Sequence, residues 1–234
     1  MIEVVLFDLD DTLFDHRDSV RQGIEAHRVS LELPGHPEEE FARWNALEEV
    51  HYHRYLTGEL DFFEQRRARA RGFVEPHGQV LADPDADAWF EAYLAHYENN
   101  WQLHTDAAAC LDRMDARGIR IGIITNGDIS FQGAKLAGLG ITDRFEHVIA
   151  SGSVGFAKPD PRIFAHACAL FAVAPAQAMY VGDRLHTDAI GAAAAGLRGV
   201  WLDRGGAAPA TQYGEATAAG AHVIRTLDDL DGLL

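Results

Sequence analysis

The chain has 234 residues, of which 47% are apolar and 24% charged, a composition typical of a globular protein that can bury a core. Its formal charge is −16 at pH 7, from 36 acidic residues against 20 Lys and Arg, and such a field repels phosphate backbones and anionic lipids. We therefore expect neither nucleic acid nor a membrane as partner, and a phosphorylated ligand would need a cation at its site.

The two cysteines, Cys110 and Cys168, lie in apolar segments with a helical pattern, which favours buried thiols in a reducing compartment over a disulfide. The N-terminus runs directly into the apolar residues Val4 to Phe7 with no basic region before them. No segment approaches the ~20 apolar residues of a membrane span. We expect a soluble, cytoplasmic protein.

Short apolar runs rich in β-branched residues recur along the chain and predict buried strands. They cover residues 3–8, 119–125, 147–151, 178–182 and 199–202. Because helical patterns separate them, we expect a Rossmann-like parallel sheet with helices on both faces. In such α/β sheets, ligands bind at the carboxyl ends of the strands.

The helices between these strands have recognisable ends. One is expected to begin at Thr105 or Asp106, either of which can cap it, and to end at Gly118. Another covers residues 161–171, and a third follows Asp188 and ends near Gly196.

The segment of residues 15–104 breaks the alternation of strand and helix. It is helical throughout, and Trp89 and Tyr93 lie on one helical face at spacing four. Most of its aromatic residues should form the core of a small bundle. We interpret it as an all-helical domain inserted into an α/β core domain of residues 1–14 and 105–234.

The first expected strand ends in the sequence Asp-Leu-Asp-Asp-Thr at residues 8–12. Asp8 and Asp10 stand two positions apart on an extended strand end and so point to the same side. Crowded carboxylates need a cation, and Mg²⁺ prefers oxygen ligands of this kind. One carboxylate can attack phosphorus while its neighbour transfers protons. A polar loop after a strand is the alternative interpretation.

Two further segments offer groups that can bind phosphate. Thr125 closes an apolar strand before Asn126 and Gly127, so its hydroxyl and the backbone N–H groups can hold phosphate oxygens, although an ordinary turn has the same sequence. Lys158 precedes Pro159, which favours an extended conformation and a stiff loop that presents the ammonium to a phosphoryl group.

The fourth segment contributes two aspartates. Asp183 follows the strand at residues 178–182 and is a natural metal ligand. Asp188 either supports the same metal or caps the next helix, and the two roles are compatible.

Together these segments resemble the phosphatase branch of the haloacid dehalogenase superfamily. That family has Asp-x-Asp-x-Thr, a strand-end Thr, Lys-Pro and Gly-Asp-x-x-x-x-Asp in this order, and all four occur here. The helical insertion is similar to the helical cap of the family, so the resemblance covers the whole chain.

The resemblance implies a role for each motif residue. Asp8 would be the nucleophile that forms an aspartyl-phosphate, and Asp10 the general acid and then the general base. Mg²⁺ would be held by carboxylate and backbone oxygens, those of Asp8, Asp10, Asp183 and Asp188. The phosphoryl oxygens would contact a hydroxyl, a backbone N–H and an ammonium, those of Thr125, Asn126 and Lys158.

The insertion offers hints about the substrate. The sequence Leu-Thr-Gly-Glu-Leu at residues 56–60 is similar to caps of nucleotidase-like members, so a nucleoside monophosphate is the first expectation, followed by phosphoglycolate or a sugar phosphate. Four arginines, Arg66, Arg67, Arg69 and Arg71, follow the phenylalanines at 62 and 63. One arginine can grip a second charged group of the substrate, or all four form surface ion pairs. No organic cofactor is suggested.

Three other functions are compatible with this family resemblance. A 2-haloacid dehalogenase shares the nucleophile and the cap, but it needs neither a metal nor the second acid that Asp10 supplies. A phosphotransferase of the mutase type uses the same four motifs. A non-catalytic protein that binds a phosphorylated ligand would normally have lost one of these residues. We expect a monomer or a homodimer.

Overall fold

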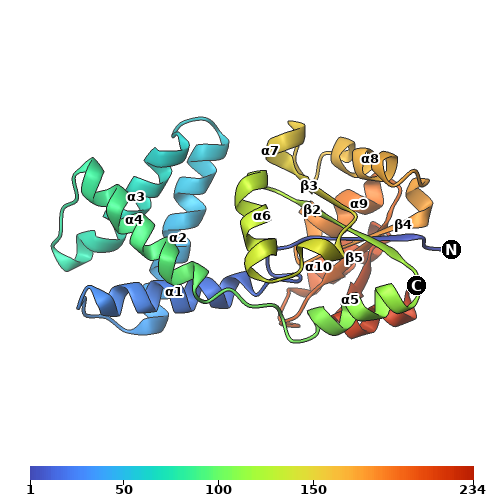
Figure 1. Ribbon diagram of the computed structural model, residues 1–234, viewed down its shortest axis with the longest axis horizontal. Coiled ribbons are helices and arrows are strands. Elements are labelled where there is room, and N and C mark those ends of the chain that lie inside the picture. Colours follow the sequence, from blue (N-terminus) through green and yellow to red (C-terminus); the bar gives the residue numbers. More distant parts are fainter. The chain divides into compact units, whose positions relative to one another are not determined.

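The structure is a computed structural model that describes the backbone of residues 1–234 and every side chain except that of Leu56. Figure 1 shows its helices and strands. The chain forms two compact units: a core unit, Met1–Asp15 with Gln102–Leu234, and a helical unit, His16–Trp101. At the start of the second core segment, the Asp15 N–H donates to the Gln102 carbonyl at 2.9 Å.

The core unit contains a six-stranded parallel sheet in the order β3-β2-β1-β4-β5-β6, surrounded by helices (Figure 1). Its strands are β1 (Val4–Phe7), β2 (Arg120–Thr125), β3 (His147–Ala150), β4 (Ala178–Gly182), β5 (Arg198–Leu202) and β6 (His222–Ile224). The α/β prediction is confirmed. The sequence pattern did not predict β6, because this edge strand has three residues and the first two are exposed.

All four residues of β1 are fully buried, as expected for an inner strand of a parallel sheet that is covered on both faces. Val4, Leu6 and Tyr180 share a core cluster with Phe164 and Phe171. The register aligns Phe7 with Ile123 of β2 and Val181 of β4. The carboxyl ends of these three strands therefore lie side by side, and the predicted site residues follow them.

The helical segments of the core unit surround the sheet. They are α5 (Ala107–Ala116), α6 (Ile129–Gly138), η2 (Thr142–Arg144), α7 (Ser151–Val154), α8 (Pro161–Leu170), η3 (Pro175–Gln177), η4 (Leu185–Ile190), α9 (Gly191–Ala194), α10 (Ala210–Ala218) and η5 (Leu227–Gly232). The turn after α5 uses Gly118 at φ 66°, in agreement with the expected end of this helix.

The expected side-chain cap of α5 is wrong. Asp106 occupies the N-cap position, but its side chain forms no capping hydrogen bond. The Asp106 carboxylate instead accepts the Leu227 N–H at 2.9 Å and pairs with Arg204 at 2.8 Å. The Asp106 carboxylate therefore binds groups from distant segments of the chain and does not accept N–H groups of its own helix.

The helical unit consists of α1 (His16–Ser30), α2 (Pro37–Leu56), α3 (Phe62–Val74), η1 (Glu75–His77) and α4 (Asp83–Glu98). Its core is aromatic: the rings of Trp44 and Tyr93 are 4.6 Å apart and those of Trp44 and Phe73 5.8 Å apart. Asp61 starts α3 with a capping box that includes Glu64. In the part of the chain that the structure describes, no helix combines the length and apolar character needed to cross a membrane.

The aromatic core of the helical unit contains a buried histidine. His27 is 1% exposed and its ring lies 4.4 Å from that of Trp89. Neither ring nitrogen has a hydrogen-bond partner among the described residues. Burial, with a smaller contribution from the charge of His96, lowers the pKa of His27 to about 4.

We predict that this histidine makes the helical unit sensitive to acid. In the unfolded chain, His27 takes up a proton as the pH falls below roughly 6.5, whereas in the folded protein it does so only near pH 4. The folded state therefore loses stability relative to the unfolded chain as the pH falls through this window. The loss should reach about 2 kcal/mol at pH 5. Urea unfolding followed by tryptophan fluorescence measures it, and His27→Phe should flatten the dependence. An unchanged pH slope in this variant would contradict the prediction.

Candidate active site

The loop after β1 begins with the first predicted site residue. The Asp8 N–H donates to the Val181 carbonyl of β4 at 2.9 Å, so the sheet fixes this residue, and its side chain is buried. The chain then turns: Asp11 has a φ of 56°, and its N–H donates to the Phe14 carbonyl at 2.8 Å. The acidic motif is therefore a tight turn fixed to the carboxyl end of the sheet.

A buried ammonium joins two of the predicted site residues. Lys158 Nζ lies 2.7 Å from Asp8 Oδ1 and 2.8 Å from Asp188 Oδ1. It also donates to the Tyr180 hydroxyl at 2.7 Å, which in turn donates to the Ile124 carbonyl at 2.8 Å. Burial opposes the charged form of Lys158, but the carboxylates of Asp188 and Asp8 outweigh it and raise the lysine pKa. Lys158 is thus a fixed positive charge beside Asp8.

Three carboxylates lie close enough to share a metal ion. Oxygens of Asp8, Asp183 and Asp188 lie within 4.8 Å of one another. Burial raises the pKa of Asp8 to about 7 and that of Asp183 well above its ordinary value, and the neighbouring carboxylates add to both shifts. A divalent cation would relieve this crowding, and oxygen ligands of this kind suit Mg²⁺.

Asp188 does not have the helix-capping role that was one of its two expected roles. It lies within the π-helical turn η4, not at the start of a helix, so it is not an N-cap. Its Oδ2 accepts the Arg184 N–H at 2.9 Å, while Oδ1 faces Lys158. A fully buried Asp188 is thereby held in place from two sides.

The predicted phosphate-binding residues are linked to each other and to α6. Thr125 Oγ1 accepts a hydrogen bond from Gln132 Nε2 at 2.6 Å. The side chain of Asn126 bonds the backbone of Lys158 twice: its amide donates to the Lys158 carbonyl at 3.0 Å, and its oxygen accepts the Lys158 N–H at 2.9 Å. The Asn126 side chain therefore holds the lysine loop in place.

Two residues that the sequence analysis did not single out contact Asp10. Lys135 Nζ lies 2.6 Å from Asp10 Oδ1, and Gln132 Nε2 donates to Asp10 Oδ2 at 3.1 Å. Both come from α6 and are buried. Their spacing of three on a helix that follows a strand end is the signal that could have identified them.

The charges of these side chains support a metal site. Four carboxylates, those of Asp8, Asp10, Asp183 and Asp188, face two ammonium groups, those of Lys135 and Lys158. When all six are ionised, four negative and two positive charges leave two negative charges. One divalent cation would balance them.

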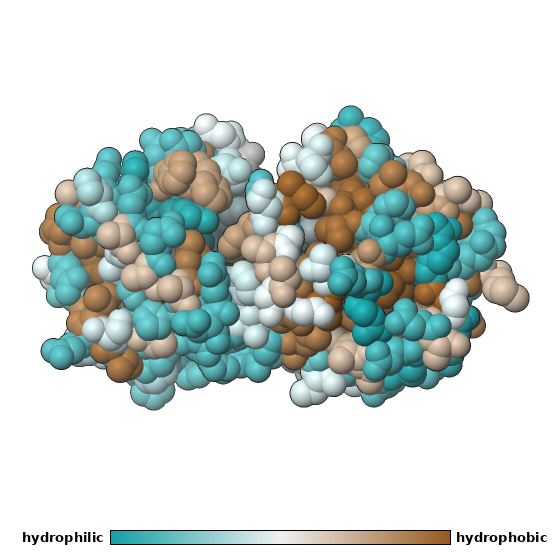
Figure 2. Space-filling view, viewed as in Figure 1, coloured by the Kyte–Doolittle hydropathy of each residue, from teal (hydrophilic) through white to brown (hydrophobic). Residues whose placement is uncertain are grey.

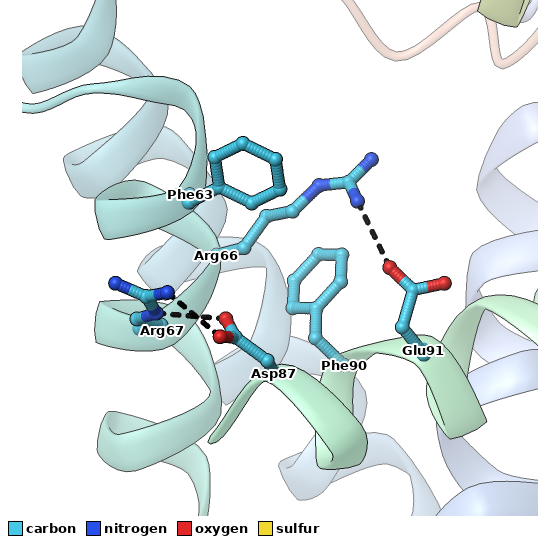
Figure 3. Close-up of a pocket in the computed structure, with 6 residues that line it drawn as sticks. All are labelled: Phe63, Arg66, Arg67, Asp87, Phe90 and Glu91. Atoms are coloured by element: carbon cyan, nitrogen blue, oxygen red, sulfur yellow. Dashed lines mark hydrogen bonds and ion pairs between the residues drawn. The ribbon is translucent and has the colours of Figure 1, made fainter. Parts of the chain in front are cut away.

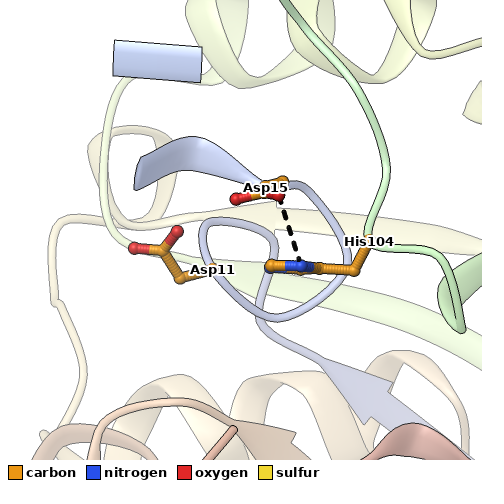
Figure 4. A group of neighbouring side chains, drawn as sticks. All are labelled: Asp11, Asp15 and His104. Atoms are coloured by element: carbon orange, nitrogen blue, oxygen red, sulfur yellow. Dashed lines mark ion pairs between the residues drawn. The ribbon is translucent and has the colours of Figure 1, made fainter. Parts of the chain in front are cut away.

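A second group of titratable side chains combines two aspartates of the chain after β1 with a histidine that precedes α5. Figure 4 shows Asp11, Asp15 and His104, whose ligand atoms lie within 4.8 Å of one another. His104 Nδ1 is 3.7 Å from Asp15 Oδ2. Burial, followed by the charge of Arg204, lowers the pKa of His104. This histidine joins the end of the motif loop to the segment that precedes α5.

Arg204 also supports the motif loop, and sequence reasoning did not identify it. It donates to the Thr12 carbonyl at 2.7 Å and pairs with Asp106 at 2.8 Å. His186, three positions after Asp183, is exposed and lies 2.7 Å from Glu215.

The arginines of α3 have carboxylate partners within the helical unit. Arg67 binds Asp87 with two hydrogen bonds of 2.7 Å, and Arg69 lies 3.2 Å from Glu48. Arg71 pairs with Asp83. The ion pairs of Arg67 and Arg71 agree with the expected surface pairs, whereas Arg69 is paired but buried.

Arg66 and Arg67 both line a pocket of about 250 Å³ (Figure 3). The Arg66 guanidinium stacks 4.1 Å from the Phe62 ring centroid, and its distance to Glu91 is 3.4 Å. Phe63 and Phe90 also line this pocket. In Figure 2, hydrophobic residues lie scattered among hydrophilic ones on the visible face of this unit, and Phe63 is itself exposed.

We predict that Gly182→Ala disturbs the carboxylate cluster. A Cβ at this position would lie 2.4 Å from the Asp188 carboxylate, which is held by Lys158 and cannot yield freely. Overpacking of this kind costs about 1–3 kcal/mol. Thermal unfolding measures the cost. The control, Gly214→Ala in α10, meets nothing within 4 Å and should leave stability unchanged or raise it. Equal melting temperatures for the two variants would show that Asp188 is not rigidly placed.

Curated relatives match most of the chain. It is 32% identical over 224 residues to a phosphoserine phosphatase of Thermus thermophilus, with 87% of this chain and 90% of that protein covered. It is 33% identical over 216 residues to a glyceraldehyde 3-phosphate phosphatase of Pyrococcus abyssi, with 88% and 83% covered. A ribulose-1,5-bisphosphate 5-phosphatase of Halopiger xanaduensis is 30% identical over the full length of both chains.

Solved structures share the whole fold. A magnesium-bound HAD-hydrolase of Bacillus subtilis has a TM-score of 0.80 at 20% identity, covering 100% of this chain and 98% of that one. The L-2-haloacid dehalogenase of Xanthobacter autotrophicus has a TM-score of 0.71 at 25% identity, with the same coverage. Residues 2–196 match the family described as haloacid dehalogenase-like hydrolases. The chain belongs to this family of hydrolases.

Proposed function

We propose that this hydrolase is a Mg²⁺-dependent phosphatase that cleaves a small phosphate monoester through an aspartyl-phosphate at Asp8. The observation that supports this most is the different surroundings of two carboxylates from one loop. Asp8 lies with Asp183, Asp188 and Lys158, whereas Asp10 is bound by a separate lysine. These different surroundings support nucleophilic attack by Asp8 and proton transfer by Asp10.

The first half of the reaction would form the intermediate. An oxygen of Asp8 attacks phosphorus, and the bond from phosphorus to the leaving oxygen breaks in line with it. Asp10 gives its proton to the leaving oxygen, so an alcohol departs. Lys158, the Thr125 hydroxyl and the Asn126 N–H would stabilise the negative charge on the other phosphoryl oxygens.

In the second half, Asp10 takes a proton from the water that attacks phosphorus. Phosphate leaves, and the Asp8 carboxylate is restored. The carboxylates of Asp8, Asp183 and Asp188, with the Asp10 carbonyl, would hold Mg²⁺. When bound, this ion neutralises charge that develops on the phosphoryl group.

We propose a primary alkyl phosphate as the substrate class. Phosphoserine, glyceraldehyde 3-phosphate and the 5-phosphate of ribulose bisphosphate, the substrates in the names of three relatives, are all phosphate esters of a primary alcohol on a small polar molecule. This evidence favours a sugar phosphate or phosphoglycolate over the nucleoside monophosphate first expected. The helical unit would act as the cap domain that selects the leaving group.

A haloacid dehalogenase activity is the second candidate, because dehalogenases are among the structural neighbours. Dehalogenation hydrolyses a carboxylate ester and needs neither a metal nor a second acid. Here three carboxylates cluster in metal-binding range, and a lysine and a glutamine hold Asp10. These contacts favour phosphate chemistry, both over dehalogenation and over a non-catalytic binding role. A mutase would have the same contacts, and it would transfer the phosphoryl group to an alcohol instead of water.

We predict that Mg²⁺ and Asp8 are both required for phosphate release. Purified protein is assayed against primary alkyl phosphates and 2-chloropropionate, with Mg²⁺ or with chelator. Asp8→Asn should lower the rate of phosphate release by about 10⁴-fold or more, because the nucleophile is lost. Asp115→Asn, which changes an exposed carboxylate of α5, is the matched control and should keep the full rate.

Two results would contradict this function. Chloride release from 2-chloropropionate without Mg²⁺ would assign the chain to the dehalogenases. Phosphate release that persists in Asp8→Asn would show that another group is the nucleophile.

A further inference from the structure

The chain contains only two lysines, Lys135 and Lys158, among its 20 Lys and Arg residues. Both are buried, and both lie beside aspartates of the candidate active site. An ammonium is a compact point charge, whereas guanidinium is a planar fork that suits bidentate pairs such as that of Arg67 with Asp87. Lys158 lies between Asp8 and Asp188, whereas Lys135 pairs with Asp10, and the role of Lys135 calls for an explanation.

The start of α6 places Lys135 beside the acidic loop. Asp128 caps this helix by accepting the N–H groups of Ser130 and Phe131 at 2.9 and 3.0 Å. Gln132 and Lys135 are three residues apart and so share one face of the helix. The capped helix is a rigid support from which both side chains reach Asp10.

The ammonium of Lys135 lies in buried, partly aromatic surroundings. Its side chain is 3% exposed, and its Nζ lies 5.3 Å from the ring centroid of Phe14 and 5.0 Å from that of Phe131. A buried ammonium is costly unless it is paired and hydrogen-bonded. The bond of 2.6 Å to Asp10 Oδ1 supplies this pairing.

The two oxygens of Asp10 are held unequally. Oδ1 has the short charge-assisted bond to Lys135, whereas Oδ2 has a bond of 3.1 Å to Gln132 Nε2. The same Gln132 amide donates to Thr125 Oγ1 at 2.6 Å, so it is also anchored to β2. Lys135 and Gln132 together restrict the rotation of the Asp10 carboxyl group.

We propose, building on the phosphatase function above, that Lys135 is a positioning residue that orients Asp10 for proton transfer. Because Oδ1 accepts the short bond from the ammonium, the transferred proton resides on Oδ2. It passes from Oδ2 to the leaving oxygen as the bond to phosphorus breaks, and Oδ2 later takes a proton from the attacking water. The Gln132 amide orients Oδ2 through a hydrogen bond and also binds the hydroxyl of Thr125, the proposed phosphate ligand.

The test compares two leaving groups. An alkyl alkoxide must be protonated as it departs, whereas p-nitrophenolate is stable as an anion and needs no acid. In Lys135→Met we expect kcat/KM for a primary alkyl phosphate to fall about 10²-fold or more, with less than about a fivefold loss for p-nitrophenyl phosphate. The control Arg144→Met removes a cation of the core unit whose partners, Asp112 and Asp115, belong to α5, and it should change neither value.

A double-mutant cycle checks that Lys135 acts through Asp10. In an Asp10→Asn background, Lys135→Met should cause no further loss with the alkyl ester, because the group that it orients has been removed. Lys135→Gln repeats both comparisons with a polar side chain in case the apolar variant does not fold.

The outcomes separate this proposal from the proposed function. If wild-type protein releases no phosphate from either ester, the phosphatase function fails and this inference fails with it. If wild-type protein hydrolyses both esters but Lys135→Met lowers both kcat/KM values equally, or lowers neither, only the positioning role is wrong. Additive losses in the cycle would also overturn it.

Discussion

The repulsion among four carboxylates at the ends of neighbouring parallel strands is the constraint on which the candidate active site depends. Two unit charges 4 Å apart interact by about 4 kcal/mol at an effective dielectric constant of 20, so four such groups are not stable together without cations. Burial raises the pKa of Asp8 and of Asp183, and the neighbouring carboxylates raise both further. The structure offsets this repulsion in part with two buried lysines, and a divalent ion would supply the remainder.

The two lysines divide the site into two parts with different chemistry. Lys158 bridges Asp8 and Asp188, and Tyr180 ties it to the carbonyl of β2. Lys135 binds Asp10 from α6. Asp8 and Asp10, the proposed nucleophile and proton carrier, thus follow one strand only two residues apart, yet each pairs with its own lysine. Such separate surroundings allow neighbouring carboxylates to perform different tasks.

Much of the fold and part of the site follow from local sequence. The five longer strands were predictable because buried parallel strands are continuous apolar runs, and Asp8, Thr125 and Asp183 stand at their ends. Their proximity then follows from the parallel order of β2, β1 and β4. The catalytic and ligand roles assigned to these residues remain predictions.

Other parts of the site depend on contacts between distant segments. Lys135 contacts Asp10 across 125 residues and Arg204 contacts Thr12 across 192. Local sequence can mark such a residue as a candidate, but it does not show which distant group the residue contacts. The expected cap at Asp106 was wrong for the same reason, since Arg204 and Leu227 occupy its carboxylate. Asp188 lies in a π-helical turn that its sequence did not reveal.

The central claim is that Asp8 attacks phosphorus, and isotope tracing tests it most directly. The protein is allowed to turn over a primary alkyl phosphate with Mg²⁺ in water labelled with heavy oxygen, and the released phosphate and the peptide containing Asp8 are analysed by mass spectrometry. The account predicts a phosphorylated Asp8 peptide after rapid quenching, with heavy oxygen in the phosphate and none in the Asp8 carboxylate. Heavy oxygen in Asp8 would indicate hydrolysis at its carbonyl carbon, as in a carboxylate ester, and would contradict the account.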